Sequence, residues 1–101
     1  MEYISMEAIK ARHQGHFFDQ GAMRFFDSRL AEYGALLADG SVLFVTSERF
    51  DYKTPRRYTV RLQNPDGRMT TKTDPVLKFQ QFDDSTSAWR ALRKLAQKLE
   101  G

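Results

Sequence analysis

Apolar and polar side chains alternate most regularly at residues 58–63 of the chain. Tyr58, Val60 and Leu62 share one face of an extended segment, and the polar residues between them share the other face. This period of two is typical of a strand with one buried face. We therefore expect residues 58–63 to form a strand.

A type I turn is predicted directly after this strand, at residues 64–67. Pro65 has its φ already fixed for the second position of such a turn, and Gly67 suits a position with positive φ. The two features together predict a hairpin. Its returning strand is expected at residues 68–73.

A second regular pattern, with the period of an α-helix, follows Asp83, Asp84 and Ser85, whose oxygens can cap a helix start. One face of this helix is apolar and carries Ala88, Trp89, Leu92, Leu95, Ala96 and Leu99. The opposite face is polar and mostly basic, and it carries Arg90, Arg93, Lys94, Gln97 and Lys98. We expect the apolar face to pack on a sheet.

The start of the chain gives shorter helical signals. Residues 3–12 fit a short helix with Ser5 as its N-cap and Gly15 beyond its end. Asp19 can cap a second short helical segment, which two pairs of phenylalanines enclose. We interpret these phenylalanines as core residues in preference to exposed stacking rings.

The middle of the chain predicts a second hairpin. At residues 28–38 helical spacing and strand alternation both fit, and the dipeptide Asp39-Gly40 favours a strand that enters a two-residue turn. Residues 42–47 are rich in β-branched and aromatic side chains and form the expected partner strand. A further short extended piece is expected at residues 76–82.

These elements predict one small α+β domain over residues 1–101. We expect an antiparallel sheet of three to five strands, a C-terminal amphipathic helix packed on one face of the sheet and a short N-terminal helical region. A chain of 101 residues with 41% hydrophobic side chains can bury one modest core. The absence of cysteine and of a long apolar run leads us to expect a soluble cytoplasmic protein.

No combination of residues predicts catalysis. His13, His16 and Asp19 have a spacing that two metal ligands can use, but Gly15 interrupts them and we expect no metal site. Serine, histidine and aspartate do not occur at a spacing that singles out a triad, and the glycines are isolated. We therefore expect a protein that is not an enzyme and binds no cofactor.

Positive charge is concentrated in the central hairpin. Residues 49–72 carry seven basic and two acidic side chains, within a chain whose formal net charge is +3. Arginine beside aromatic rings suits both phosphate binding and base stacking. The candidate binding residues are Arg49, Tyr52, Lys53, Arg56, Arg57, Arg61 and Arg68.

Three interpretations of this basic segment remain open. The first is a solvated sheet face whose charges form ion pairs. The second is a nucleic-acid-binding surface, and the third is a surface that binds a host or phage protein. We carry the second as the main hypothesis and the third as the alternative. The oligomeric state and the identity of the partner do not follow from the sequence.

Four segments resemble a group of short uncharacterised proteins from bacteria, phages and mobile elements. They are H-F-F-x-x-x-x-M-R-F-F-x-S-R at residues 16–29, F-V-T-S-E-x-F-D at 44–51, P-R-x-Y-T-V-R at 55–61 and F-Q-x-F at 79–82. The resemblance covers roughly residues 16–95. It implies a domain of unknown function in a bacterial or phage accessory protein that acts by binding, and it brings no catalytic residues with it.

Overall fold

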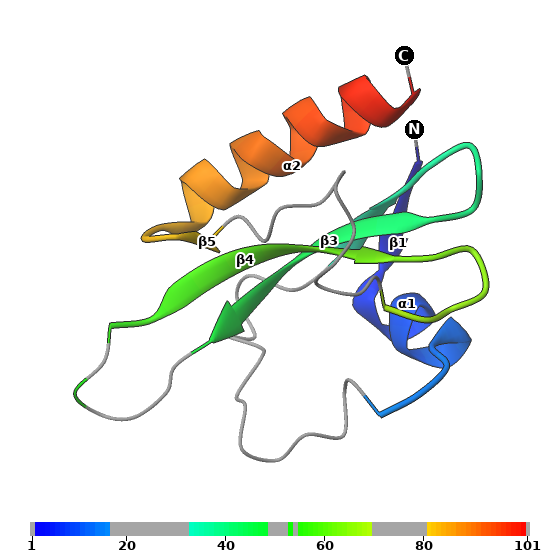
Figure 1. Ribbon diagram of the computed structural model, residues 1–101, viewed down its shortest axis with the longest axis horizontal. Coiled ribbons are helices and arrows are strands. Elements are labelled where there is room, and N and C mark those ends of the chain that lie inside the picture. The colour runs from blue at the N-terminus through cyan, green and yellow to red at the C-terminus, as the bar shows by residue number, and fades with distance from the viewer. Residues whose placement is uncertain (1, 17–32, 49–52, 54, 70–80, 101) are drawn as a thin grey trace.

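The computed structural model describes residues 2–16, 33–48, 53, 55–69 and 81–100 (Figure 1). The elements follow in the order β1 (Glu2–Ser5), α1 (Met6–Arg12), β2 (Tyr33–Leu36), β3 (Val42–Glu48), β4 (Arg57–Gln63), β5 (Gln81–Phe82) and α2 (Ser85–Glu100). The strands form one antiparallel sheet in the order β1-β2-β3-β4-β5. The expected α+β class, with a C-terminal helix on the sheet, is confirmed.

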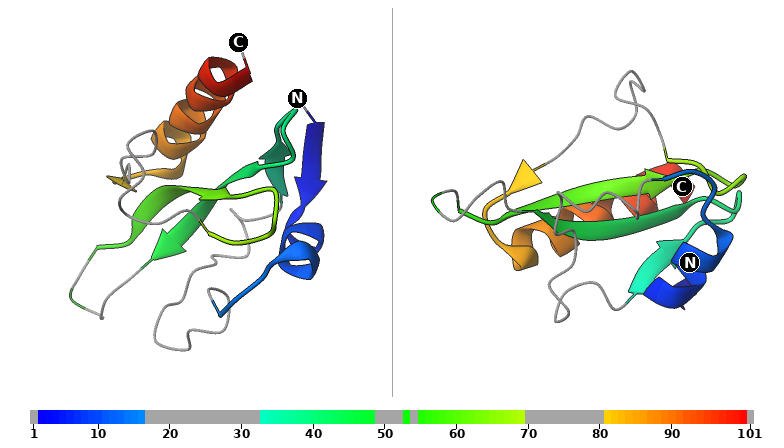
Figure 2. Two further views of the ribbon diagram at one scale, coloured as in Figure 1. Left: turned by 45° about the vertical axis from the view of Figure 1, so that its right-hand side comes forward. Right: turned by 90° about the horizontal axis from the view of Figure 1, so that it is seen from below.

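Helix α2 covers one face of the sheet (Figures 1 and 2). Its fully buried residues Ala88, Leu92 and Ala96 pack with side chains of β2, β3 and β4, such as Val45 and Val60. The predicted alternation of β4 is confirmed, because Tyr58, Val60 and Leu62 all belong to this core. Burial of these small apolar surfaces is the main force that holds α2 on the sheet.

Helix α1 packs on the opposite face (Figure 2). Met6 and Ile9 form a second apolar cluster with Val42 and Phe44 of β3. The side-chain amide of Gln63 is buried there, and its Nε2 donates to the carbonyl of Ile9 at 3.0 Å. That carbonyl lies in the last turn of α1, where backbone acceptors lack partners within the helix.

The predicted helix at residues 3–12 is partly wrong. Ser5 is the N-cap, as expected, and its hydroxyl accepts from the Ala8 amide at 3.1 Å. The residues before it form strand β1, with Tyr3 opposite Ala35 of β2. Their backbone groups are satisfied by a strand that is distant in sequence, and no local pattern indicates this pairing.

The predicted two-residue turn at Asp39-Gly40 is also wrong, although the hairpin exists. The Leu37 amide donates to the Ser41 carbonyl at 2.8 Å, and the Gly40 amide donates to the Leu37 carbonyl at 3.0 Å. These bonds enclose a three-residue loop in which Gly40 has a φ of 92°. A type I turn followed by a left-handed glycine is the usual form of such a loop.

The type I turn at residues 64–67 is confirmed. The Gly67 amide donates to the Asn64 carbonyl at 2.9 Å, and Gly67 has a φ of 90°. A Cβ at Gly67 would lie 2.1 Å from the Arg12 carbonyl oxygen, so the turn packs tightly against the end of α1. Of the returning strand expected at residues 68–73, Met69 forms a bridge with Gln63, the Arg68 carbonyl accepts from the Asn64 amide at 2.7 Å, and residues 70–73 lie outside the described residues.

Other expectations fall partly or wholly outside the described ranges. These are the helical segment after Asp19, the strand residues 28–32 and the extended residues 76–80. Strand β3 and the terminal helix agree with their predicted positions to within one or two residues.

Candidate functional site

Two of the candidate arginines lie where β4 begins, and both have partners. The guanidinium of Arg56 donates from Nη1 to the Ser47 hydroxyl at 2.6 Å, and Ser47 is buried on β3. Arg57 forms an ion pair with Asp83. Tyr58 lies opposite Phe82, so Arg57 and Asp83 occupy the next opposed position of the β4–β5 pair.

Arg61 lies in the middle of β4 on the face that α2 does not cover. Its Nε donates to the Thr46 hydroxyl at 3.2 Å, and Thr46 is buried. The side chain of Arg61 is itself half-buried. Arg56 and Arg61 thus hold buried hydroxyls of β3 and lie on opposite faces of the sheet, because strand side chains alternate.

The remaining described candidates are exposed and lie far apart. Lys53 is in the connection from β3 to β4, and Arg68 follows the turn after β4. Strand β4 has seven residues and separates these two positions by about 20 Å. Arg49 and Tyr52 lie outside the described residues. The hairpin therefore does not gather its described basic residues into one patch.

Helix α2 presents a more compact basic surface. Arg90, Arg93, Lys94 and Lys98 are all exposed on the helix face that points away from the sheet, and we call them the helix cations. They span about 12 Å along the helix. Within the described part of the chain, the side chains of Arg93, Lys94 and Lys98 have no hydrogen bond or ion pair.

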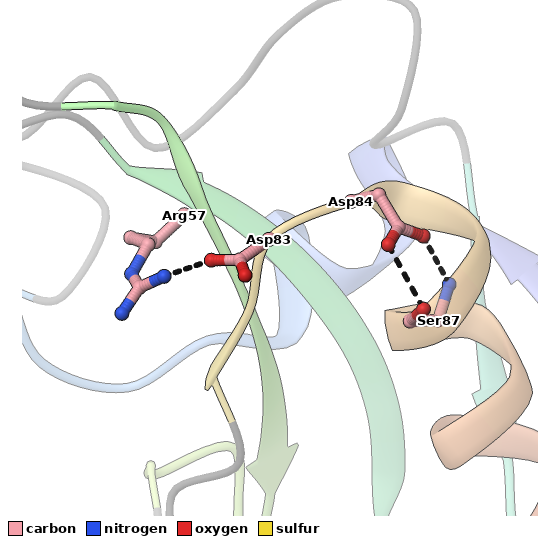
Figure 3. Close-up of polar contacts among 4 residues, drawn as sticks. All are labelled: Arg57, Asp83, Asp84 and Ser87. Atoms are coloured by element: carbon pink, nitrogen blue, oxygen red, sulfur yellow. Dashed lines mark hydrogen bonds and ion pairs between the residues drawn. The ribbon is translucent and has the colours of Figure 1, made fainter.

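The start of α2 is acidic and fixed by a cap (Figure 3). The carboxylate of Asp84 accepts from the Ser87 amide at 2.7 Å and from the Ser87 hydroxyl at 3.0 Å. These hydrogen bonds stabilise the charged form and lower the pKa of Asp84, with a smaller contribution from the charge of Arg90. The first helix cation, Arg90, comes after this capped first turn of α2.

Three aromatic rings beside α2 form a cluster that sequence reasoning missed. Tyr3 of β1 contacts Tyr33 of β2 with ring centroids 5.4 Å apart, and Tyr33 contacts Trp89 of α2 with centroids 5.0 Å apart. Tyr3 and Tyr33 are the most exposed large apolar side chains of the described residues. Because the three rings are distant in sequence, only the strand pairing could have indicated their contact.

The described residues give no metal-binding group. Among them, no three histidine, aspartate or glutamate side chains come together in a way that could hold a metal ion. His13 lies beside Gln63, His16 is exposed, and Asp19 is outside the described ranges. No helix in the described part of the chain has both the length and the apolar composition needed to cross a membrane.

Comparison with known proteins gives a family and no activity. No curated protein matches the chain, and no solved structure matches it. A family model described as a family of unknown function, DUF7447, matches residues 3–93. The match covers most of the chain, which therefore belongs to this family of unknown function.

Proposed function

We propose that this protein is a non-catalytic nucleic-acid-binding protein. The observation that carries the proposal is the row of helix cations on α2, of which Arg93, Lys94 and Lys98 lack partners among the described residues. A polyanion that neutralises these charges releases the counterions condensed along its backbone, and that release favours binding. In keeping with the sequence resemblance, we propose an accessory protein of bacterial, phage or mobile-element origin that acts in the cytoplasm.

The length of the row suits a nucleic-acid backbone. Its span of about 12 Å corresponds to roughly three nucleotides of one strand at 3.4 Å per nucleotide. Lysine and arginine contacts to phosphate position a protein without reading the base sequence. We therefore expect binding that depends little on sequence and reaches micromolar affinity at low salt.

The hairpin residues take a secondary part in this proposal. Lys53, Arg57 and Arg68 are exposed and can reach phosphates outside the helix surface. Arg56 and Arg61 already bind buried hydroxyls, so we assign them mainly to stability. The alternative function, a module that binds a host or phage protein, has the exposed Tyr3 and Tyr33 in its favour, because tyrosine is common at the centre of protein interfaces.

The test compares two variants that remove the same charge. One replaces Arg93, Lys94 and Lys98 with glutamine, and the other replaces Lys53, Arg57 and Arg68 with glutamine. Fluorescence anisotropy of labelled single-stranded and duplex DNA and RNA gives the dissociation constants at one low salt concentration. We expect the helix variant to lose at least about tenfold more affinity than the hairpin variant.

Each other outcome has a distinct meaning. A greater loss of affinity in the hairpin variant would support nucleic-acid binding but would show that the hairpin residues, and not the helix cations, form the site. Absence of binding by the unaltered protein to every nucleic acid at low salt would reject the function. A protein partner bound with defined stoichiometry and weak salt dependence would then support the alternative.

A further inference from the structure

The aromatic cluster of Tyr3, Tyr33 and Trp89 joins three elements on the α2 side of the sheet. Tyr3 lies opposite Ala35, and Ala35 belongs to the core under α2. Ile4 belongs to the cluster under α1, so its neighbour Tyr3 points to the α2 side. The three rings thus form a continuous surface from the edge strand β1 to the side of α2.

Exposure distinguishes these rings from ordinary core residues. Tyr3 is 47% exposed, Tyr33 is 43% exposed, and Trp89 is half-buried. Tyr3 and Tyr33 meet at an interplanar angle of 82°, and Tyr33 and Trp89 meet at 40°. The mutual contacts hold each ring in place, so little rotamer freedom remains to be lost when a ligand binds.

Two contacts fix α2 alongside β2 in the same direction. Tyr33 meets Trp89 near one end, and the Ala38 amide donates to Glu100 Oε1 at 3.1 Å near the other. Five residue steps of extended chain and eleven of helix both measure about 16 Å, so the two contacts agree with each other.

This alignment places the aromatic cluster next to the helix cations. Tyr3 is opposite Ala35, two residues beyond Tyr33, which is about 7 Å along β2. The same distance along α2 leads from Trp89 to about Arg93, one helical turn later on the same side of the helix. Tyr3 therefore lies at the level of Arg93, and Arg93 is the helix cation on the side of α2 that carries Trp89.

We propose that this surface binds single-stranded nucleic acid, with bases stacked on Tyr3 and Tyr33 and phosphates held by Arg93 and its neighbouring helix cations. The inference rests on the proposed function and specifies its substrate. A positive groove beside exposed aromatic rings is the usual arrangement for single strands, because every base has a π-face that a ring can stack on. A duplex keeps its bases stacked on each other inside the helix, so it has no exposed base face on which these rings could stack.

The test separates stacking from charge on the unaltered protein. Its affinity is measured for a short oligothymidylate and for an abasic deoxyribose-phosphate oligomer of the same length, in the same salt. Both carry the same backbone charge, and only the first has bases. We expect the thymidylate to bind tighter by about 5- to 150-fold for each stacked base and to change the fluorescence of Trp89, the only tryptophan.

A double variant, Tyr3→Leu with Tyr33→Leu, locates the stacking site while keeping apolar side chains in place. The matched control is Leu99→Ala, which alters another exposed apolar residue on the last turn of α2. We expect the double variant to bind both oligomers equally and the control to keep the preference for thymidylate. Circular dichroism of both variants is the control that checks whether they keep the fold.

Three results would overturn the inference. Equal affinity of the unaltered protein for both oligomers would reject base stacking and leave the proposed function intact. A preference for thymidylate that survives in the double variant would place stacking elsewhere. If neither oligomer binds at low salt, the inference fails, and the proposed function fails with it when RNA and duplex DNA do not bind either.

Discussion

The basic residues of the β4 hairpin and those of α2 differ in what surrounds them. Arg56 and Arg61 donate to the buried hydroxyls of Ser47 and Thr46, and Arg57 pairs with Asp83. The helix cations Arg93, Lys94 and Lys98 have no such partner in the described structure. The density of positive charge along a sequence thus does not tell which charges are available to a ligand, because the partners come from neighbouring strands.

The largest effect on stability is expected from Arg56→Ala. The substitution leaves the buried Ser47 hydroxyl without its donor, and the free energy of unfolding should fall by about 1–3 kcal/mol. Urea denaturation measures the change, and Ser47→Ala completes a double-mutant cycle. Ser47→Ala should cost less in the Arg56→Ala background than in the unaltered protein. A stability unchanged by Arg56→Ala would show that Arg56 is as available to ligands as the helix cations.

A pH-dependent effect is expected at the start of α2. Hydrogen bonds from Ser87 lower the pKa of Asp84 below its ordinary value of 3.8. The charged cap therefore stabilises the fold above that value, and the stabilisation is lost as the pH falls through the lowered pKa of the folded state. Asp84→Asn should show a smaller loss of melting temperature between neutral pH and about pH 2.5 than the unaltered protein. An identical loss in both proteins would contradict the role of this cap.

A smaller effect is expected at the ion pair of Arg57 and Asp83. Both side chains are exposed, 46% and 82%, so water and salt weaken their attraction. Arg57→Ala should change the free energy of unfolding by less than about 0.5 kcal/mol, and so should Asp83→Ala. A coupling energy above about 1 kcal/mol in the double-mutant cycle would contradict this expectation. The ion pair would then stabilise the fold, as the contact of Arg56 with Ser47 does.

The smallest effect on stability is expected from the helix cations. Replacing Arg93, Lys94 and Lys98 with glutamine removes no hydrogen bond or ion pair of the described structure and keeps residues that favour helix. The free energy of unfolding should stay within about 0.5 kcal/mol of the unaltered value. Urea denaturation measures it, and a larger loss would mean that these charges serve the fold.

Short-range patterns predicted a large part of the fold. The alternation of Tyr58, Val60 and Leu62 and the amphipathic spacing of α2 both reflect one buried face, and both predictions are confirmed. Strand β1 was missed because its four residues are held by pairing with β2. The loop length at Gly40 was wrong because the Asp-Gly dipeptide does not show whether Ser41 pairs with Ala38, as a two-residue turn requires, or with Leu37, as it does in the structure.

The candidate site was harder to predict than the fold. Arg57 pairs with Asp83 only because β5 lies beside β4, and Tyr33 meets Tyr3 and Trp89 only because three separate elements converge. Such contacts depend on strand order, and the order of strands does not follow from local spacing. The basic face of α2 was visible in the sequence, whereas its lack of partners became clear only from the packing.

The salt dependence of single-strand binding tests the central claim most directly, that the helix cations bind phosphate. The slope of log K against log salt is measured for the unaltered protein and for the variant with Arg93, Lys94 and Lys98 replaced by glutamine. Four phosphate contacts give a slope of about −3, and removal of three should bring it to about −1. The same slope in both proteins would contradict the claim, because the helix cations would then displace no counterions.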